Sequence, residues 1–440
     1  MSGVSPRRRR EIIDALRRGT VPQRGLDAFA VGLDRLGPTL EDELRTVASG
    51  TAAFKAVRGE YGSGKTFFVR WLAERAKAQG FATAEVQISE TETPLHQLEK
   101  VYRRLVERLS TADQADGAFR TIVERWNFAL EEDVLATGVR EDDAPELSRR
   151  VSELMEGRLA EVSVRSPSFA IALRSHREAV AAGDAALADG ILAWLGAQPN
   201  VPADIRRRAG VRGEIDHFGA LAHLQGLLTV LRDAGHPGLL VVLDEVETLQ
   251  RVRSDVREKA LNALRQLIDE VDSGRFPGLY LLMTGTPAFY DGPQGIQRLA
   301  PLAQRLHVDF SGDPRFDNAR AVQIRLPAFD RERLEEVGRR VRDIYAEGAS
   351  APDRIASLVD DAYVAELASA VGGELGGRVG IVPRVFLRKL VGEVLDKVED
   401  HADFRPREHY ALTVTDGELT LEEREARAAA RSADDIELDL

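Results

Sequence analysis

Residues 59–66 constrain this chain more than any other stretch. They read Gly-Glu-Tyr-Gly-Ser-Gly-Lys-Thr and fit the pattern G-x-x-x-x-G-K-[ST]. An apolar run at 53–57 precedes them and a helix-forming segment at 67–76 follows, which is the context that a phosphate-binding loop requires. Glycines let successive backbone N–H groups turn toward a phosphate, and the helix N-terminus adds partial positive charge. The sequence therefore predicts a nucleoside triphosphate site.

The loop also predicts which residues contact the nucleotide. Lys65 is expected to reach the β- and γ-phosphates, and the Thr66 hydroxyl to ligate Mg²⁺, so ATP and Mg²⁺ are the expected ligands. The adenine is expected near Val21, Pro22 and Gly25. The alternative is a glycine-rich turn that binds nothing. The full set of expected nucleotide contacts is Gly59, Glu60, Tyr61, Gly62, Ser63, Gly64, Lys65, Thr66 and Phe67, together with Asp244.

Asp244 and Glu245 form the second strong signal. They directly follow the apolar run 238–243, which is typical of a strand buried on both faces. Ligands of open α/β sheets bind at the carboxyl ends of the strands. We expect Asp244 to hold Mg²⁺ and Glu245 to orient the attacking water. Glu247 is expected to be structural.

Four further residues are candidates for sensing or stabilising the γ-phosphate. Thr284 ends the next apolar run, 279–283, and is expected to contact the phosphate or the water; the alternative is a cap on the following turn. Arg298 and Arg305 lie where a guanidinium could reach the nucleotide of a neighbouring subunit, which requires a homo-oligomer; surface ion pairing is the alternative. Arg384 follows a proline at a predicted helix start, which aims it at the site.

The order of strands and helices predicts an α/β fold with a parallel sheet. Strands are expected at 53–57, 81–88, 238–243, 279–283 and 322–327. Segments 1–94 and 235–328 are expected to form a nucleotide-binding core, with a helical insertion at 95–234. A helical lid at 329–400 and an acidic C-terminal tail at 401–440 follow. The insertion is too long for a plain crossover and is a natural surface for a partner.

Composition excludes several classes of protein. The formal net charge of −12 argues against a protein covered in nucleic acid, and the absence of cysteine excludes disulfides and thiol catalysis. Histidines are scattered without metal-ligand spacing. No apolar run approaches the roughly 20 residues needed to span a bilayer. A cytoplasmic location away from membranes is therefore expected.

The motifs together resemble those of AAA+ ATPases, particularly the origin-recognition and Cdc6-like branch. Those motifs are residues 59–66, 239–245 and 380–384 and the strand that ends at Thr284. Residues 58–67, 89–95 and 243–249 are also similar to the BrxD family, the ATP-binding proteins of BREX phage-defence loci. The resemblance implies a sheet in the order 5-1-4-3-2, ATP as ligand, and action beside a helicase partner against phage DNA.

Two functions stay open from the sequence. One is an ATP-hydrolysing motor or switch that assembles on DNA or with a DNA-processing partner. The other is a nucleotide-gated scaffold with slow hydrolysis and no direct DNA contact. Glu245 favours hydrolysis, because a pure binding module does not need it. Only residues 401–440 follow the predicted lid, too few for the winged helix that origin-recognition proteins carry, which argues against duplex reading of that kind.

Overall fold

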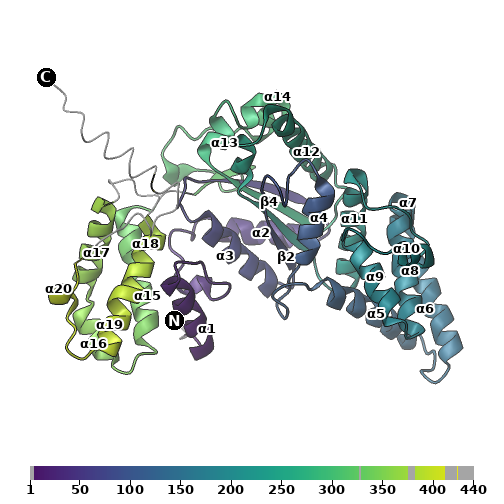
Figure 1. Cartoon of the computed structure of the whole chain (residues 1–440), viewed down its shortest axis with the longest axis horizontal. Helices are drawn as coiled ribbons and strands as arrows, with labels where there is room; N and C mark the ends of the chain where they lie inside the picture. The colour runs from purple at the N-terminus through teal and green to yellow at the C-terminus, as the bar shows by residue number, and fades with distance from the viewer. Residues whose placement is uncertain (1–3, 327–328, 375–381, 412–423, 425–440) are drawn as a thin grey trace.

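A five-stranded parallel sheet organises the molecule (Figure 1). The structure is a computed structural model that describes residues 4–326, 329–374, 382–411 and 424. The sheet order is β2-β3-β4-β1-β5, which is the order that the resemblance implied. The predicted α/β class and sheet order are therefore confirmed. The strands are β1 (Ala53–Arg58), β2 (Ala82–Gln87), β3 (Leu239–Asp244), β4 (Leu279–Gly285) and β5 (Gln323–Arg325).

The register of the strands brings the predicted site residues to one edge. Gln87 pairs with Asp244 across β2 and β3, and Val57 pairs with Thr284 across β1 and β4. Leu243 pairs with Met283, so the next residues along β3 and β4 also lie side by side. Because all five strands run parallel, their carboxyl ends meet at this edge.

The sheet separates two hydrophobic cores. Successive strand residues point to opposite faces, so Leu240 and Val242 enter one core while Val241 and Leu243 enter the other. This explains the continuous apolar runs in β3 and β4, whose residues are buried along the whole strand.

The N-terminal helices and the C-terminal helices share one face of the sheet. Helix α1 packs against α15 and α18, so the two ends of the described chain meet there. Residues 382–400 form one continuous helix with a π-helical middle, η6 (Lys389–Leu395), between α18 and α19. The helices on this face are α1 (Pro6–Arg17), α2 (Gly37–Ala48), α3 (Lys65–Ala78), α15 (Arg331–Ala346), α16 (Pro352–Leu358), α17 (Asp361–Glu374), α18 (Val382–Arg388), α19 (Asp396–Asp400) and α20 (Pro406–His409), with the 3₁₀ turn η1 (Leu26–Ala28).

The opposite face carries the helices between β2 and β3, of which α5 to α10 extend away from the sheet (Figure 1). Asp143, Asp184 and Asp216 cap α6, α9 and α11 by accepting backbone N–H bonds. These helices are α4 (Leu98–Glu107), α5 (Phe119–Ala136), α6 (Ala144–Arg158), α7 (Ala160–Arg165), α8 (Pro167–Ala181), α9 (Ala185–Leu195), α10 (Ala203–Arg208) and α11 (His217–Asp233). After β3 come η2 (Val246–Gln250), α12 (Ser254–Asp272), α13 (Pro287–Asp291), η3 (Ile296–Arg298), α14 (Ala300–Leu306) and η4 (Pro314–Phe316).

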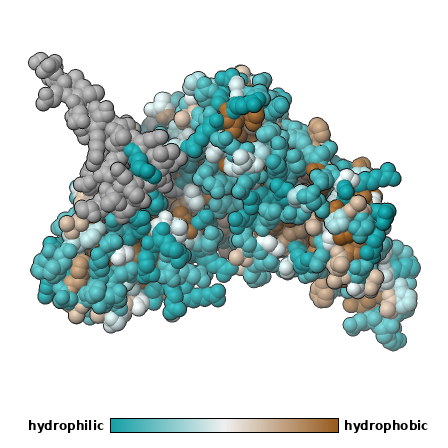
Figure 2. All heavy atoms as spheres, in the orientation of Figure 1, coloured by the Kyte–Doolittle hydropathy of each residue, from teal (hydrophilic) through white to brown (hydrophobic). Residues whose placement is uncertain are grey.

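The face seen in Figure 2 is hydrophilic over most of its area, with hydrophobic residues showing over the α12–α14 region and over the helices between β2 and β3. Within the described ranges, no helix is both long enough and apolar enough to cross a bilayer. Most of the expected acidic tail, and residues Gly380 and Ile381 of the motif before Arg384, lie outside the described residues.

Candidate active site

The phosphate loop is shaped by its glycines and ends on the N-terminus of α3. Gly64 caps the helix with a φ of 89°, a left-handed conformation that suits glycine, and no side chain caps the helix there. A Cβ on Gly59 would lie 2.3 Å from the Ser63 Oγ, so a residue with a side chain at this position would collide with Ser63 inside the loop. The Ser63 hydroxyl is buried without a hydrogen-bond partner in the described chain. A glycine-rich loop at a helix N-terminus, with an unsatisfied hydroxyl, suits a phosphate.

Lys65 connects the loop to the end of β3. Its Nζ donates to the carbonyl oxygens of Gly59 at 2.9 Å and Glu60 at 3.3 Å. The same ammonium lies 3.7 Å from the Glu247 Oε1 and 5.2 Å from the centre of the Tyr61 ring. Lys65 is only 8% exposed, so it is held at the base of the loop. The loop and the strand end therefore belong to one site.

Asp244, Glu245 and Thr284 form a hydrogen-bonded group at the ends of β3 and β4. The Thr284 Oγ1 donates to the Asp244 Oδ1. The backbone N–H of Glu245 lies 3.1 Å from that same Oδ1 and 3.2 Å from the Thr284 Oγ1. Thr284 is fully buried, so its hydroxyl orients Asp244 in this structure rather than facing solvent. Asp244 is held by two donors at Oδ1, and no hydrogen bond from a described residue is made to its Oδ2.

The carboxylate of Glu245 is held by Gln87, which the sequence did not single out. The Gln87 Nε2 donates to the Glu245 Oε2 at 2.9 Å. Glu245 has a φ of 59°, a left-handed conformation that is uncommon for a residue with a side chain. Because β2 lies on the far side of β3 from β4 and β1, this bond draws Glu245 away from the phosphate loop. Only the register of β2 against β3 reveals the pair.

Glu247 is a buried carboxylate that faces the loop lysine. It is 4% exposed, and its Oε2 has no hydrogen-bond partner among the described residues. Burial raises the pKa of Glu247 above its ordinary value, while the charge of Lys65 opposes that rise. The sequence predicted a structural role, and the structure places this carboxylate as the counter-ion of Lys65.

The residues expected to hold Mg²⁺ suit that ion. Thr66 supplies a hydroxyl from the first turn of α3, and Asp244 supplies a carboxylate oxygen from the end of β3. Mg²⁺ prefers oxygen ligands and keeps several waters and phosphate oxygens rather than a full protein cage. Within the described ranges, no cluster of three or more acidic or histidine side chains forms a separate metal site. The donor set therefore fits a magnesium ion bound together with a nucleotide.

The structure places the three arginines outside the phosphate loop. The Arg305 guanidinium forms ion pairs of 2.6 Å with Asp269 and 2.8 Å with Asp272, both on α12. The Arg298 Nη2 lies 3.4 Å from the hydroxyl of Ser254, at the start of that helix.

Arg384, on α18, packs beside Gly19, where a Cβ would lie 3.8 Å from its Cγ. Arg384 is therefore next to the segment expected to line the adenine.

That segment is fixed to α3. The Arg70 guanidinium donates to the Val21 carbonyl at 2.8 Å, and the Glu74 carboxylate accepts the N–H of Gly25 at 2.7 Å. Phe329, at the start of the C-terminal helices, approaches Gly64, where a Cβ would lie 3.5 Å from its ring. The expected base site thus lies between α3 and helices from both ends of the chain.

Comparisons with known proteins give a family match and a similar solved structure. The profile of the family described as "BREX system ATP-binding protein BrxC/D" matches residues 4–414. Among solved structures, the chain is similar to the Aeropyrum pernix ORC2 protein in ADPNP–ADP complexes. The two are 14% identical, the match covers 86% of this chain and 70% of that chain, and the TM-score is 0.34. Among curated proteins, no relative matches the sequence.

Proposed function

The chain belongs to the BREX system ATP-binding protein BrxC/D family, and we propose that it hydrolyses ATP during BREX phage defence. The observation that carries the proposal is the contact of 3.7 Å between Lys65 and Glu247. This contact joins the phosphate loop to the strand end that carries Asp244 and Glu245. A loop that only binds a nucleotide would not need these two acids beside it. The inferred place of action is the cytoplasm.

In the proposed reaction each residue acts on a different part of the triphosphate. The loop N–H groups and Lys65 hold the β- and γ-phosphates, and Lys65 exchanges its carbonyl partners for phosphate oxygens. Thr66 and Asp244 would hold Mg²⁺, which supplies positive charge to the phosphate oxygens when bound. Thr284 positions Asp244 through its hydroxyl. Glu245 orients the attacking water and accepts its proton.

A neighbouring subunit completes the proposed site. Among the described residues, neither Arg298 nor Arg305 contacts Lys65 or Asp244. We therefore assign the trans-acting guanidinium to Arg298, because Arg298 is exposed and has a single long hydrogen bond, whereas two carboxylates hold Arg305. Arg384 is proposed to contact the nucleotide from the lid, on the side of the adenine.

The helices between β2 and β3 are proposed to receive the partner, a BREX helicase or a DNA-associated complex. Large hydrophobic side chains that stay exposed gather on them: Phe128, Val164, Val180 and Phe218, from 55% to 82% exposed. Contiguous exposed apolar patches are typical of partner surfaces, and we propose that these side chains contribute to such a surface. Hydrolysis in the core would then change the position of these helices through α4 and α11, which pack on each other beside the sheet.

A nucleotide-gated scaffold is the second candidate function. The bond between Gln87 and Glu245 favours it, because a glutamate held away from the loop slows hydrolysis and prolongs the ATP-bound state. In this function ATP fixes a conformation, and hydrolysis only resets it.

ATP turnover by the purified chain separates the two. Turnover and ATP binding are measured for the protein without DNA, with single-stranded DNA and with double-stranded DNA. The variants Lys65→Ala and Glu245→Gln are measured in the same way as controls. The proposal expects turnover that Glu245→Gln removes while ATP binding stays. Absence of turnover in every condition, with ATP binding intact, would favour the scaffold.

A further inference from the structure

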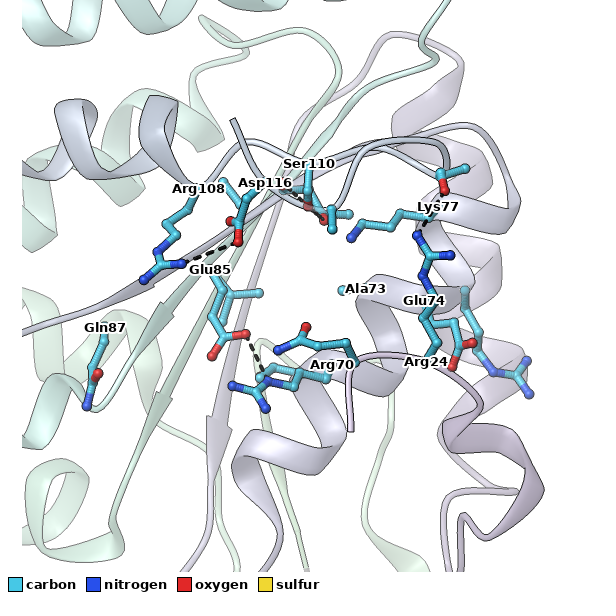
Figure 3. Close-up of a pocket in the computed structure, with 18 of the residues that line it drawn as sticks. Arg24, Arg70, Ala73, Glu74, Lys77, Glu85, Gln87, Arg108, Ser110 and Asp116 are labelled. Carbon is cyan, nitrogen blue, oxygen red and sulfur yellow. Dashed lines mark hydrogen bonds and ion pairs between the residues drawn. The ribbon is translucent and has the colours of Figure 1, made fainter. Parts of the chain in front are cut away.

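A cavity of about 690 Å³ lies between α3, β2 and the chain after α4 (Figure 3). On α3 its lining residues include Arg70, Ala73, Glu74 and Lys77, which recur at three- and four-residue spacing and so form one face of the helix. None of the loop residues 59–66 lines it, nor do Asp244 and Glu245. The cavity is therefore separate from the phosphate loop and the strand-end acids, although it adjoins the segment expected to line the adenine through Arg70 and Glu74.

The charge of the cavity differs from that of the chain. Its lining contains seven arginine or lysine side chains and five carboxylates, whereas the whole chain carries a formal charge of −12. A local excess of positive charge in an acidic protein is not explained by overall composition, and a concave site focuses such a field.

Several of the carboxylates are already occupied by other donors. Both oxygens of Glu74 accept backbone N–H groups, from Gly25 at 2.7 Å and Leu26 at 2.9 Å. Asp27 accepts the indole N–H of Trp71 at 2.7 Å and also pairs with Arg75. These bonds leave the negative charges in place: Asp27 balances Arg75, and the charges of the lining carboxylates oppose the lowering of the Lys77 pKa, so the lining keeps an excess of two cations.

Among the described residues, the lining cations that form no ion pair with a carboxylate are Arg8, Arg24 and Lys77. The Lys77 ammonium forms no hydrogen bond or ion pair with any described residue, and Figure 3 shows its side chain pointing into the cavity. The Arg24 guanidinium donates only to the Ala112 carbonyl, at 3.4 Å. Burial, and then the nearby charge of Arg24, lower the pKa of Lys77. Two cations thus converge on one space, where an anion would relieve their repulsion.

The chemistry of these cations favours a phosphate group over other anions. A guanidinium offers paired donors that match phosphate oxygens, and an ammonium adds a compact charge. Arg108 faces the cavity from its other wall, where its contact with Asp116 is long, at 3.4 Å (Figure 3). A volume of about 690 Å³ leaves room for the rest of a nucleotide-sized molecule or for a segment of a strand.

We propose that this cavity binds a phosphate group between Arg24 and Lys77, supplied by a free phosphate compound or by the backbone of a nucleic-acid strand. The site goes beyond the proposed hydrolysis of ATP, and it does not depend on it. It gives an acidic protein a second place, besides the phosphate loop, at which the chain holds a phosphate-bearing ligand.

The test measures binding with one equivalent of ADP present, so that the phosphate loop is occupied without free ADP competing for the cavity. Inorganic phosphate is titrated by calorimetry, and a labelled single-stranded oligothymidylate by fluorescence anisotropy at low salt. The variant Arg24→Ala/Lys77→Ala is compared with Lys259→Ala/Arg320→Ala, which removes the same charge from exposed positions outside the cavity. The expected result is a loss of affinity of roughly tenfold or more in the first variant only, because it removes charged hydrogen bonds. The ADP affinity of both variants is expected to stay unchanged.

The two probes identify the source of the phosphate. Binding of phosphate alone assigns the site to small phosphate compounds, and binding of the oligonucleotide assigns it to a nucleic-acid backbone. Absence of both, equal losses in the two variants, or equally tight binding of poly-glutamate overturns the proposal. Because ADP binding is measured in the same samples, a failure here is distinguishable from a failure of the nucleotide site.

Discussion

The carboxylates at the end of β3 and the arginines after β4 differ in how completely one chain determines their arrangement. Asp244 is 4% exposed and held by Thr284 and the Glu245 backbone, and the neighbouring Glu247 faces Lys65. Arg298 and Arg305 lie on the exposed side of α12, where they contact its residues instead of a phosphate. The carboxylate group is buried and preorganised, and the arginine group is exposed.

The carboxylates are therefore positioned by their own chain, whereas the arginines are available to a neighbouring subunit. Buried hydrogen-bonded groups keep their geometry without a ligand, since leaving them unpaired costs free energy. Exposed ion pairs contribute little, about 0–1 kcal/mol, so a neighbouring subunit can replace them. We therefore expect the strand end to act within one chain and one of the arginines to act between chains.

The largest expected effect is that of Arg298→Ala. If Arg298 stabilises charge on a neighbour's γ-phosphate, its removal lowers turnover by a factor on the order of 10³. Arg305→Ala, the matched control, is expected to change turnover less than threefold, because its two ion pairs with Asp269 and Asp272 keep it on α12. Steady-state ATP hydrolysis measures both, and the opposite ranking would reverse the assignment.

Mixing two inactive variants sharpens this prediction. In an assembly of Arg298→Ala and Glu245→Gln subunits, a site can combine an intact Glu245 from one subunit with an intact Arg298 from the other. Turnover should therefore recover on mixing. No recovery, in samples whose mixed assembly is verified by size, would place both residues in the same chain's site.

The second expected effect is that of Glu245→Gln. The amide keeps the size of the side chain but cannot accept the proton of the water, so turnover should fall by roughly 10² to 10³. ATP affinity should stay within about threefold, because Lys65 and the loop are untouched. Glu258→Gln, on the exposed surface of α12, is the control. A parallel loss of ATP binding would show that Glu245 supports the loop rather than the reaction.

The sequence predicted the sheet and the strand-end acids well, because both depend on local patterns. A glycine-rich loop after an apolar run, and acids directly after Leu243, are visible without any tertiary information. The sheet order could not be read from periodicity and came from the family resemblance, which the structure confirms.

What the sequence missed depends on contacts between distant segments. Gln87 meets Glu245 only through the pairing of β2 with β3, 158 residues apart along the chain. Lys55 lies in the run 53–57, which the sequence presents as apolar; it is 2% exposed, and its Nζ donates to Glu43 at 2.6 Å. Neither partner has a local signal, so no pattern in the sequence could reveal these pairs.

The third expected effect is that of Gln87→Leu. Since β2 lies on the side of β3 away from the phosphate loop, loss of the 2.9 Å bond frees Glu245 to turn toward the water. Basal turnover should rise by up to roughly tenfold, the scale of a hydrogen bond to a charged group. Gln79→Leu, an exposed glutamine just after α3, is the control. A fall in turnover would mean that Gln87 holds Glu245 in its working position.

The smallest expected effect concerns stability and comes from Glu247→Gln. Burial raises the pKa of Glu247, so the charged form is costly in the folded protein at neutral pH, and its Oε2 has no partner in the described chain. A group with a raised folded-state pKa adds stability below its unfolded value and loses it as pH rises through the folded value. The glutamine variant is never charged, so it should be more stable than the natural chain by about 1 kcal/mol at pH 7.

Denaturant unfolding of the nucleotide-free protein at pH 7 and at about pH 4 measures this difference, and unfolding of Glu258→Gln provides the exposed control. The gain should shrink toward pH 4, because the natural carboxyl is then protonated in both states. A loss of stability at pH 7 would show that the attraction of Lys65 outweighs the cost of burial. The ion pair between Lys65 and Glu247 would then stabilise the end of β3. In that case the carboxylates after β3 and the arginines after β4 would differ only in their burial.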